Sequence, residues 1–247
     1  TYEIPKPILP MLDKTLLEHV VEVVPNEKVD QVVVAGGYKV DDIEAYFKHV
    51  DVPYDDVPYD VTIVKETEPL GTGGALGNCR DVISDRFVCL NGDIISSLDM
   101  QIGLDLQEKN GGIGTLALWE VEDPTRFGIV GLDDDQRITQ FKEKPKKEEV
   151  FSNLINAGSY LFEDSIFDYI PQGRSSLERD VFPKLAQEGQ LNGFSFEGYF
   201  IDAGTPKSWS LGVQVSITNK RWNSGKNIET NWHADDSINV DAKSTVE

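Results

Sequence analysis

Lysines, carboxylates and glycines recur along this chain in six short motifs whose residue types suit chemistry on phosphate groups. The motifs hold two lysines that can meet phosphate oxygens, two aspartates that can bind a divalent cation, and glycines that let a ligand approach the backbone. They are Pro5-Lys6-Pro7, Leu70-Gly71-Thr72-Gly73-Gly74, Asn91-Gly92-Asp93, Glu143-Lys144-Pro145, Asn156-Ala157-Gly158 and Asp202-Ala203-Gly204-Thr205. Each motif is weak alone, and the ordered set predicts metal-assisted nucleotidyl transfer.

The first two motifs would hold phosphate and nucleotide. Prolines on both sides of Lys6 are expected to keep its backbone extended and its side chain aimed at a phosphate, although a lysine near the start of a helix at Thr15 is the plain alternative. The glycine segment 70–75 follows an expected strand and opens a helix, so its backbone amides should line a nucleotide. A simple turn is the alternative there, because no Walker lysine follows.

The two aspartates are candidate ligands for Mg²⁺. Asp93 follows an apolar strand ending at Leu90, and the carboxyl edge of a parallel sheet is where ligands bind, although Asn-Gly-Asp is also good turn chemistry. Asp202 precedes Gly204-Thr205-Pro206 at the start of a helix, where it either caps the helix or supplies a second metal carboxylate.

Glu143 and Lys144 end a predicted strand immediately before Pro145. We expect both side chains to face the site, with Glu143 accepting hydrogen bonds from sugar hydroxyls and Lys144 meeting a phosphate. A solvated run of charges over residues 142–149 is the alternative.

Composition indicates one α/β domain. The 247 residues are 39% hydrophobic, enough for a substantial core. No apolar run of about 18 residues and no signal pattern occur, which predicts a cytoplasmic protein without a membrane partner. A net charge of −20 argues against nucleic acid, so lysines and a metal must invert the field inside the site. Cys79 and Cys89 are expected to be core thiols, and the three histidines are assigned no chemistry.

Apolar strands and amphipathic helices alternate in the first half of the chain, and strands dominate after about Gly111. This pattern predicts a doubly wound, Rossmann-like, mostly parallel mixed sheet with an antiparallel β insertion. Helices are expected at 15–24, 41–50, 73–80, 176–187 and 206–218, and strands at 32–35, 61–64, 87–90, 113–121, 127–131, 137–141 and 156–162. A five-residue repeat over 51–60 is interpreted as a lengthened surface loop.

From about Pro5 to Trp222 the ordered motifs resemble the sugar-1-phosphate nucleotidyltransferases, which include mannose-1-phosphate guanylyltransferases and glucose-1-phosphate thymidylyl- and uridylyltransferases. The resemblance implies catalytic roles for Lys6, Asp93, Lys144 and Asp202, with both aspartates on Mg²⁺. It implies that Glu143 binds sugar hydroxyls. The other substrate-binding positions that it implies are Leu70, Gly71, Thr72, Gly73, Gly74, Asn91, Gly92, Gly128, Asn156 and Gly158.

The implied substrates are a nucleoside triphosphate and a sugar 1-phosphate, which give an NDP-sugar and pyrophosphate. The stretches 126–130 and 176–183 look most like guanylyltransferases and favour GTP with mannose 1-phosphate, while thymidylyl- and uridylyltransferases share nearly every motif. A non-catalytic regulatory subunit that binds a nucleotide sugar is the alternative of another class. The sequence is compatible with a homo-oligomer.

The chain departs from the family at its start. The family begins with a strand and a G-G-x-G-T-R loop that wraps the triphosphate and supplies an arginine, and this chain starts at Thr1, after that point. A parallel sheet without a central strand would leave backbone unpaired, so we expect the native protein to carry that segment. We assign 1–222 to the nucleotidyltransferase domain and 223–247 to a polar tail or the start of an incomplete left-handed β-helix.

Overall fold

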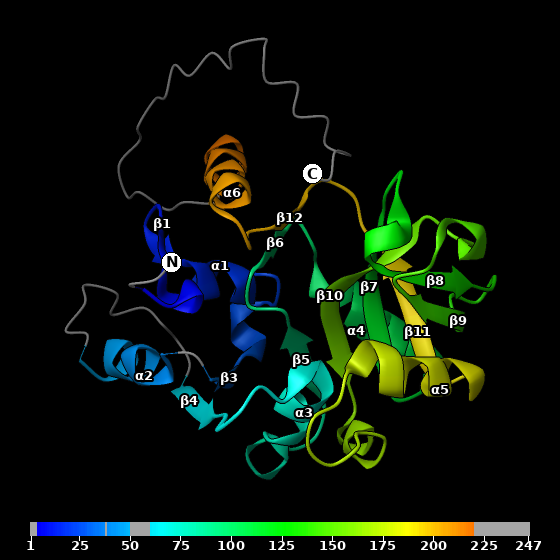
Figure 1. Cartoon of the computed structure of the whole chain (residues 1–247), viewed down its shortest axis with the longest axis horizontal. Coiled ribbons are helices and arrows are strands. Elements are labelled where there is room, and N and C mark those ends of the chain that lie inside the picture. The colour runs from blue at the N-terminus through cyan, green and yellow to red at the C-terminus, as the bar shows by residue number, and fades with distance from the viewer. Residues whose placement is uncertain (1–3, 38, 50–59, 220–247) are drawn as a thin grey trace.

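A computed structural model describes residues 4–37, 39–49 and 60–219 (Figure 1). The tail at 223–247, His233 and nearly all of the repeat at 51–60 lie outside the described residues. The helices are α1 Leu16–Val21, α2 Val40–His49, α3 Gly71–Gly77, α4 Met100–Asn110, α5 Phe182–Gln187 and α6 Pro206–Thr218. The strands are β1 Pro10–Met11, β2 Lys14–Thr15, β3 Gln31–Gly36, β4 Asp60–Lys65, β5 Phe87–Leu90, β6 Ile94–Ser96, β7 Gly114–Glu120, β8 Gly128–Leu132, β9 Ile138–Glu143, β10 Leu154–Phe162, β11 Leu191–Ser195 and β12 Phe200–Asp202.

The largest sheet has the order β11-β7-β10-β8-β9, and β5 also pairs with β10. β11 runs parallel to β7, whereas β10 runs antiparallel to β5, β7 and β8. The predicted mixed α/β class is confirmed. Antiparallel pairings take a larger share of this sheet than expected, because β10 returns from the β8–β9 hairpin and lies against strands that run the other way.

Two smaller pairs complete the strand arrangement. β3 and β4 pair in parallel, and within the described residues no strand joins them to β5, so the expected sheet is divided. β6 and β12 form an antiparallel ribbon. Figure 1 shows this ribbon beside α6, above the β3–β4 pair and next to the strands of the largest sheet.

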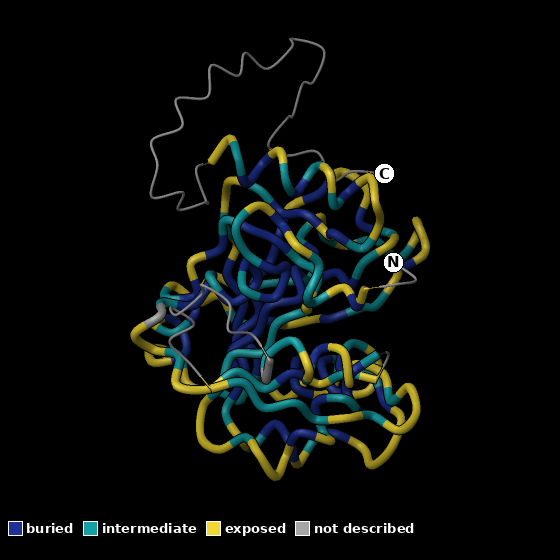
Figure 2. Tube along the Cα trace, turned by 90° about the vertical axis from the view of Figure 1, so that its left-hand side faces the viewer, coloured by how far each residue is buried: buried dark blue, intermediate teal, exposed yellow. Residues whose placement is uncertain are grey.

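The core lies on both faces of the largest sheet. Alternate residues of β7 point to opposite faces, so Leu116 and Leu118 pack with Phe182 and Leu185 of α5, while Ala117 belongs to the cluster that contains residues of α4. Figure 2 shows the buried residues gathered in the interior. The helices on the two faces therefore hold the strand ends at fixed positions.

One buried polar network joins α4 to this sheet. Asn192 donates to the carbonyl of Gly111 at 2.8 Å and to Thr115 Oγ1 at 3.3 Å, and Gln107 donates to the carbonyl of Gly112 at 2.7 Å. Thr115 also donates to Gln107. Such a satisfied network specifies the position of α4, because any shift of the helix would leave buried polar groups without hydrogen-bond partners.

Most expected elements occur near the predicted bounds, with two instructive differences. The helix expected at 176–187 divides into a π-helical turn, Leu177–Val181 (η7), and α5. α4 was not predicted, although Asp99 caps its start and Gly111, with φ of 62°, ends it. Among the described helices, none combines the length and the apolar character needed to cross a membrane.

Candidate functional site

The β6–β12 ribbon brings the two predicted metal ligands together. Asp202 is paired with Ile94 across the ribbon, and the amide of Ala203 donates to the carbonyl of Asp93 at 2.7 Å. Asp93 therefore meets Asp202 through an antiparallel ribbon, whereas the sequence predicted a place at the edge of a parallel sheet. The two carboxylates come from distant parts of the chain and lie at the same end of the ribbon.

Lys6 reaches the same place. Its Nζ lies 3.5 Å from Asp93 Oδ2, and a Cβ placed on Gly204 would lie 3.6 Å from that nitrogen. The Lys6 and Asp93 side chains are 44% and 36% exposed, so a ligand can reach the pair. The prediction of an extended backbone at Lys6 is wrong: a hydrogen bond from the amide of Leu9 to the Lys6 carbonyl closes a 3-10 turn, Lys6–Ile8 (η1).

Asp202 is not the cap of α6. Its Oδ1 accepts the amide of Gly204 at 2.8 Å, while Thr205 Oγ1 accepts the amide of Ser208 at 3.1 Å and fills the capping position. Thr205 therefore caps α6, and the alternative in which Asp202 caps this helix is wrong. A carboxylate oxygen that is not needed for capping can serve a cation.

Glu143 and Lys144 lie at the end of β9. Gly128 of β8 is the register partner of Glu143, and Lys144 Nζ lies 3.6 Å from Glu143 Oε1. Lys144 has a positive φ of 46°, which breaks the alternation of the strand. This backbone agrees with the expectation that the two side chains face the same region.

Glu143 is poorly solvated for a carboxylate, since its side chain is 16% exposed. Burial raises the pKa of Glu143, and the charge of Glu178 raises it further. The nearby positive charges of Lys144 and Arg179 act in the opposite direction.

The glycine segment at the start of α3 packs against residues 173–177. The amides of Gly73 and Gly74 donate to the Ser175 carbonyl at 3.0 and 3.3 Å. A Cβ on Gly71 would lie 2.5 Å from that oxygen, so glycine is required for this close approach. The sequence predicted that the amides of Gly73 and Gly74 face a nucleotide. In the structure both amides instead donate to the carbonyl of Ser175.

The Asn156-Ala157-Gly158 motif lies where β10 leaves β8 and joins β5. A register shift against β7 occurs after Asn156, and Gly158 has a φ of 68°. The Gly158 carbonyl accepts the amide of Asn91 at 2.8 Å, next to Gly92 and Asp93. Irregular strand positions of this kind are common beside binding sites, and this one connects the Asp93 and Glu143 ends of the candidate site.

Two residues of the site were not assigned from the sequence. Tyr160 is buried and its hydroxyl accepts from Asn156 Nδ2 at 2.9 Å; burial raises its pKa well above the ordinary value. Glu178, on η7, accepts hydrogen bonds from Thr72 and Ser176. The even spacing of Asn156 and Tyr160 along a strand was the available signal for the first. Glu178 lies in the stretch 176–183 that resembles guanylyltransferases, but no role was assigned to it.

The two cysteines were predicted to be core thiols; Cys79 is buried, and Cys89 is partly buried against the core. Burial raises the pKa of Cys79 to about 11 and that of Cys89 to about 12. Within the described residues, no three or more histidine, cysteine, aspartate or glutamate side chains form a metal cluster.

Fold and site together define a mixed α/β protein in which Lys6 of η1 meets Asp93 beside the β6–β12 ribbon, and Glu143 and Lys144 lie at the end of β9. A family model described as nucleotidyl transferase matches residues 1–215. The chain belongs to the nucleotidyl transferase family.

Three known proteins show what the chain is similar to. It is 30% identical over 249 residues to the mannose-1-phosphate guanylyltransferase catalytic subunit beta of Drosophila pseudoobscura pseudoobscura, which covers 100% of this chain and 66% of that protein. It is 32% identical over 226 residues to the Xenopus tropicalis subunit of the same name, covering 90% of this chain and 61% of that one. The chain thus spans less than two thirds of the length of these relatives.

The third is a solved structure. HddC from Yersinia pseudotuberculosis, complexed with GMP-PN, matches with a TM-score of 0.67 and 28% sequence identity, covering 85% of this chain and 89% of that chain. The agreement over most of both chains supports the strand and helix arrangement described above.

Proposed function

We propose that this protein transfers a nucleotidyl group from a nucleoside triphosphate to a sugar 1-phosphate. The observation that carries the proposal is the convergence of Lys6, Asp93 and Asp202 at one end of the β6–β12 ribbon. Membership of the nucleotidyl transferase family supports it. We assign the transfer domain to residues 1–222.

The reaction is a displacement at phosphorus. A phosphate oxygen of the sugar 1-phosphate attacks the α-phosphorus of the triphosphate, and the bond to pyrophosphate breaks. Lys144 holds the attacking phosphate, Lys6 supports the phosphates of the nucleotide, and Glu143 orients the sugar by accepting hydrogen bonds from its hydroxyls. Catalysis is then mainly positioning and electrostatics.

Asp93 and Asp202 fit Mg²⁺, because both are oxygen donors and both lie at the same end of the ribbon. When bound, the ion neutralises charge that develops on the phosphates. The remaining positions proposed to contact substrate are Leu70, Gly71, Thr72, Asn91, Gly92, Gly128, Asn156 and Gly158.

We propose GTP and mannose 1-phosphate as substrates, in keeping with the names of the two relatives. The test is pyrophosphate release by the protein at its full length with Mg²⁺, across four nucleoside triphosphates and the 1-phosphates of mannose, glucose and N-acetylglucosamine. Release with GTP and mannose 1-phosphate alone is expected. Release only with dTTP or UTP and glucose 1-phosphate would correct the substrates, and tight NDP-sugar binding without any release would favour a regulatory subunit.

A further inference from the structure

Glu178 binds two hydroxyl groups that come from different segments of the chain. Its Oε2 accepts from Thr72 Oγ1 and from Ser176 Oγ, each at 2.6 Å, and Thr72 Oγ1 accepts the amide of Leu177 at 3.0 Å. Hydroxyl-to-carboxylate bonds of this length are charge-assisted and stronger than neutral ones. Glu178 therefore fastens the glycine segment at the start of α3 to η7.

The same turn also packs against the strand that ends in Glu143. η7 contacts both α3 and β9, and it is a π-helical turn, a form that is rare and frequently found at functional sites. Glu178 is partly buried, and its charge acts on Glu143 and on Tyr160. One carboxylate thus lies between the segment proposed for the nucleotide and the residue proposed for the sugar.

We propose that Glu178 is a positioning residue that couples the nucleotide side of the site, through Thr72, to the sugar side, through Glu143. This role rests on the proposed function. Glu178 acts by holding Thr72 and by its charge beside Glu143, and it need not touch either substrate.

The charge of Glu178 gives this role a distinct signature. The ionised form of Glu143 accepts hydrogen bonds from sugar hydroxyls, so KM for sugar 1-phosphate should rise as pH falls and Glu143 takes up a proton. The groups that act on Glu143 are Glu178, which raises its pKa, and Lys144 and Arg179, which lower it. Removing the charge of Glu178 should therefore move the rise in KM to lower pH.

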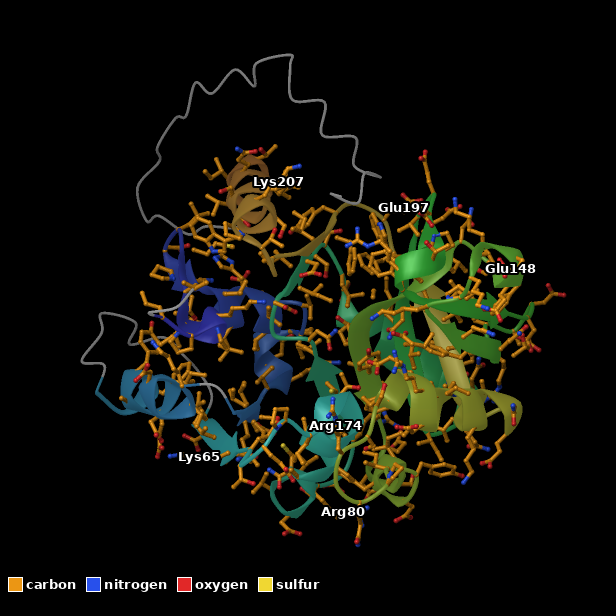
Figure 3. The ribbon with its side chains drawn as sticks, viewed as in Figure 1. Lys65, Arg80, Glu148, Arg174, Glu197 and Lys207 are labelled. Carbon is orange, nitrogen blue, oxygen red and sulfur yellow. The ribbon has the colours of Figure 1, made fainter. Side chains whose placement is uncertain are left out.

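The test compares Glu178→Gln, Glu178→Ala and Thr72→Val with wild type at full length, measuring kcat and KM for each substrate from pH 5 to 8. The control is Glu148→Gln, at an exposed carboxylate on the rim of the molecule (Figure 3). We expect Glu178→Gln to shift the pH dependence of KM for sugar 1-phosphate to lower pH, and Thr72→Val to raise KM for the triphosphate. The control should match wild type in both.

An unchanged pH profile in Glu178→Gln, with kinetics like those of Glu148→Gln, would overturn the role of Glu178 while leaving the proposed function in place. Failure of wild type to turn over any substrate pair would overturn the proposed function, and the role of Glu178 with it. If Glu178→Ala fails to fold, Glu178→Gln still decides the matter, because glutamine is close in shape to the native side chain.

Discussion

Lys6, Asp93 and Asp202 come from three distant segments of the chain that lie together at one end of the β6–β12 ribbon. Each residue type was predictable from its motif, since lysine suits phosphate and aspartate suits a cation. Their proximity depends on the register of β6 with β12, which sets Asp202 opposite Ile94. Strand register is a long-range property, so short motifs carry no information on it.

The stability of the protein should report the environment of Glu143. Its pKa is raised in the folded state by burial and then by Glu178, so the folded state binds this proton more tightly than the unfolded chain. The stabilisation is present below the unfolded pKa of about 4.3 and is lost as pH rises through the raised folded pKa. Glu143→Gln is therefore expected to unfold at higher urea concentration than wild type at pH 7, with the difference vanishing near pH 4.

The same variant should bind sugar 1-phosphate less well, because a carboxylate that accepts hydrogen bonds is replaced by an amide. We expect KM to rise about 10- to 100-fold at pH 7. Glu148→Gln serves as the matched control in both assays, since Glu148 is exposed. If Glu143→Gln is no more stable than wild type at pH 7, the ionised carboxylate of Glu143 does not lower the stability of the wild-type protein.

At the scale of elements, the irregular position in β10 at Asn156 to Gly158 lies beside the candidate site. Gly158 and Gly173 both have positive φ, 68° and 77°, and alanine at either costs roughly 1–2 kcal/mol for the backbone. A Cβ on Gly158 would lie 2.4 Å from Asn91 Nδ2, whereas a Cβ on Gly173 meets nothing within 4 Å. Gly158→Ala should therefore lose about 1–3 kcal/mol more than Gly173→Ala in urea unfolding.

If the two alanine variants lose the same free energy of unfolding, the side chain of Asn91 moves aside without cost, and its contact with Gly158 does not connect the two ends of the site. If Gly158→Ala does not fold, the double variant Gly158→Ala with Asn91→Ala, which removes the side chain that the new Cβ would meet, should regain part of the lost stability.

Several elements were predictable because local signals agree with their environment. α6 and β5 occur at the predicted bounds, since a proline start and a short apolar run mark them clearly. α4 was missed although Asp99 and Gly111 mark its ends, because Gly103 and polar residues weaken its apolar pattern. The π-helical form of η7 was not predicted from the local sequence, and η7 contacts two elements, α3 and β9, that are distant from it in the chain.

At the scale of the whole molecule, a chain with a net charge of −20 places lysines at both ends of the candidate site. Lys6 lies at the β6–β12 ribbon and Lys144 at the end of β9. These two lysines, together with a divalent cation held by Asp93 and Asp202, would offset the carboxylates of the site and let an acidic protein take anionic substrates. The mixed α/β class was predictable from alternating patterns, whereas the antiparallel course of β10 was not, because it depends on which strands become neighbours.

The most direct measurement is pyrophosphate release by wild type and by Asp93→Asn, at full length with excess Mg²⁺, with Asp81→Asn as the control at an exposed aspartate. We predict turnover by wild type and by Asp81→Asn, and a loss of about 100-fold or more in Asp93→Asn without a matching loss of stability. Near-normal turnover by Asp93→Asn would remove Asp93 from the metal site, and no pyrophosphate from wild type with any substrate pair would contradict nucleotidyl transfer itself.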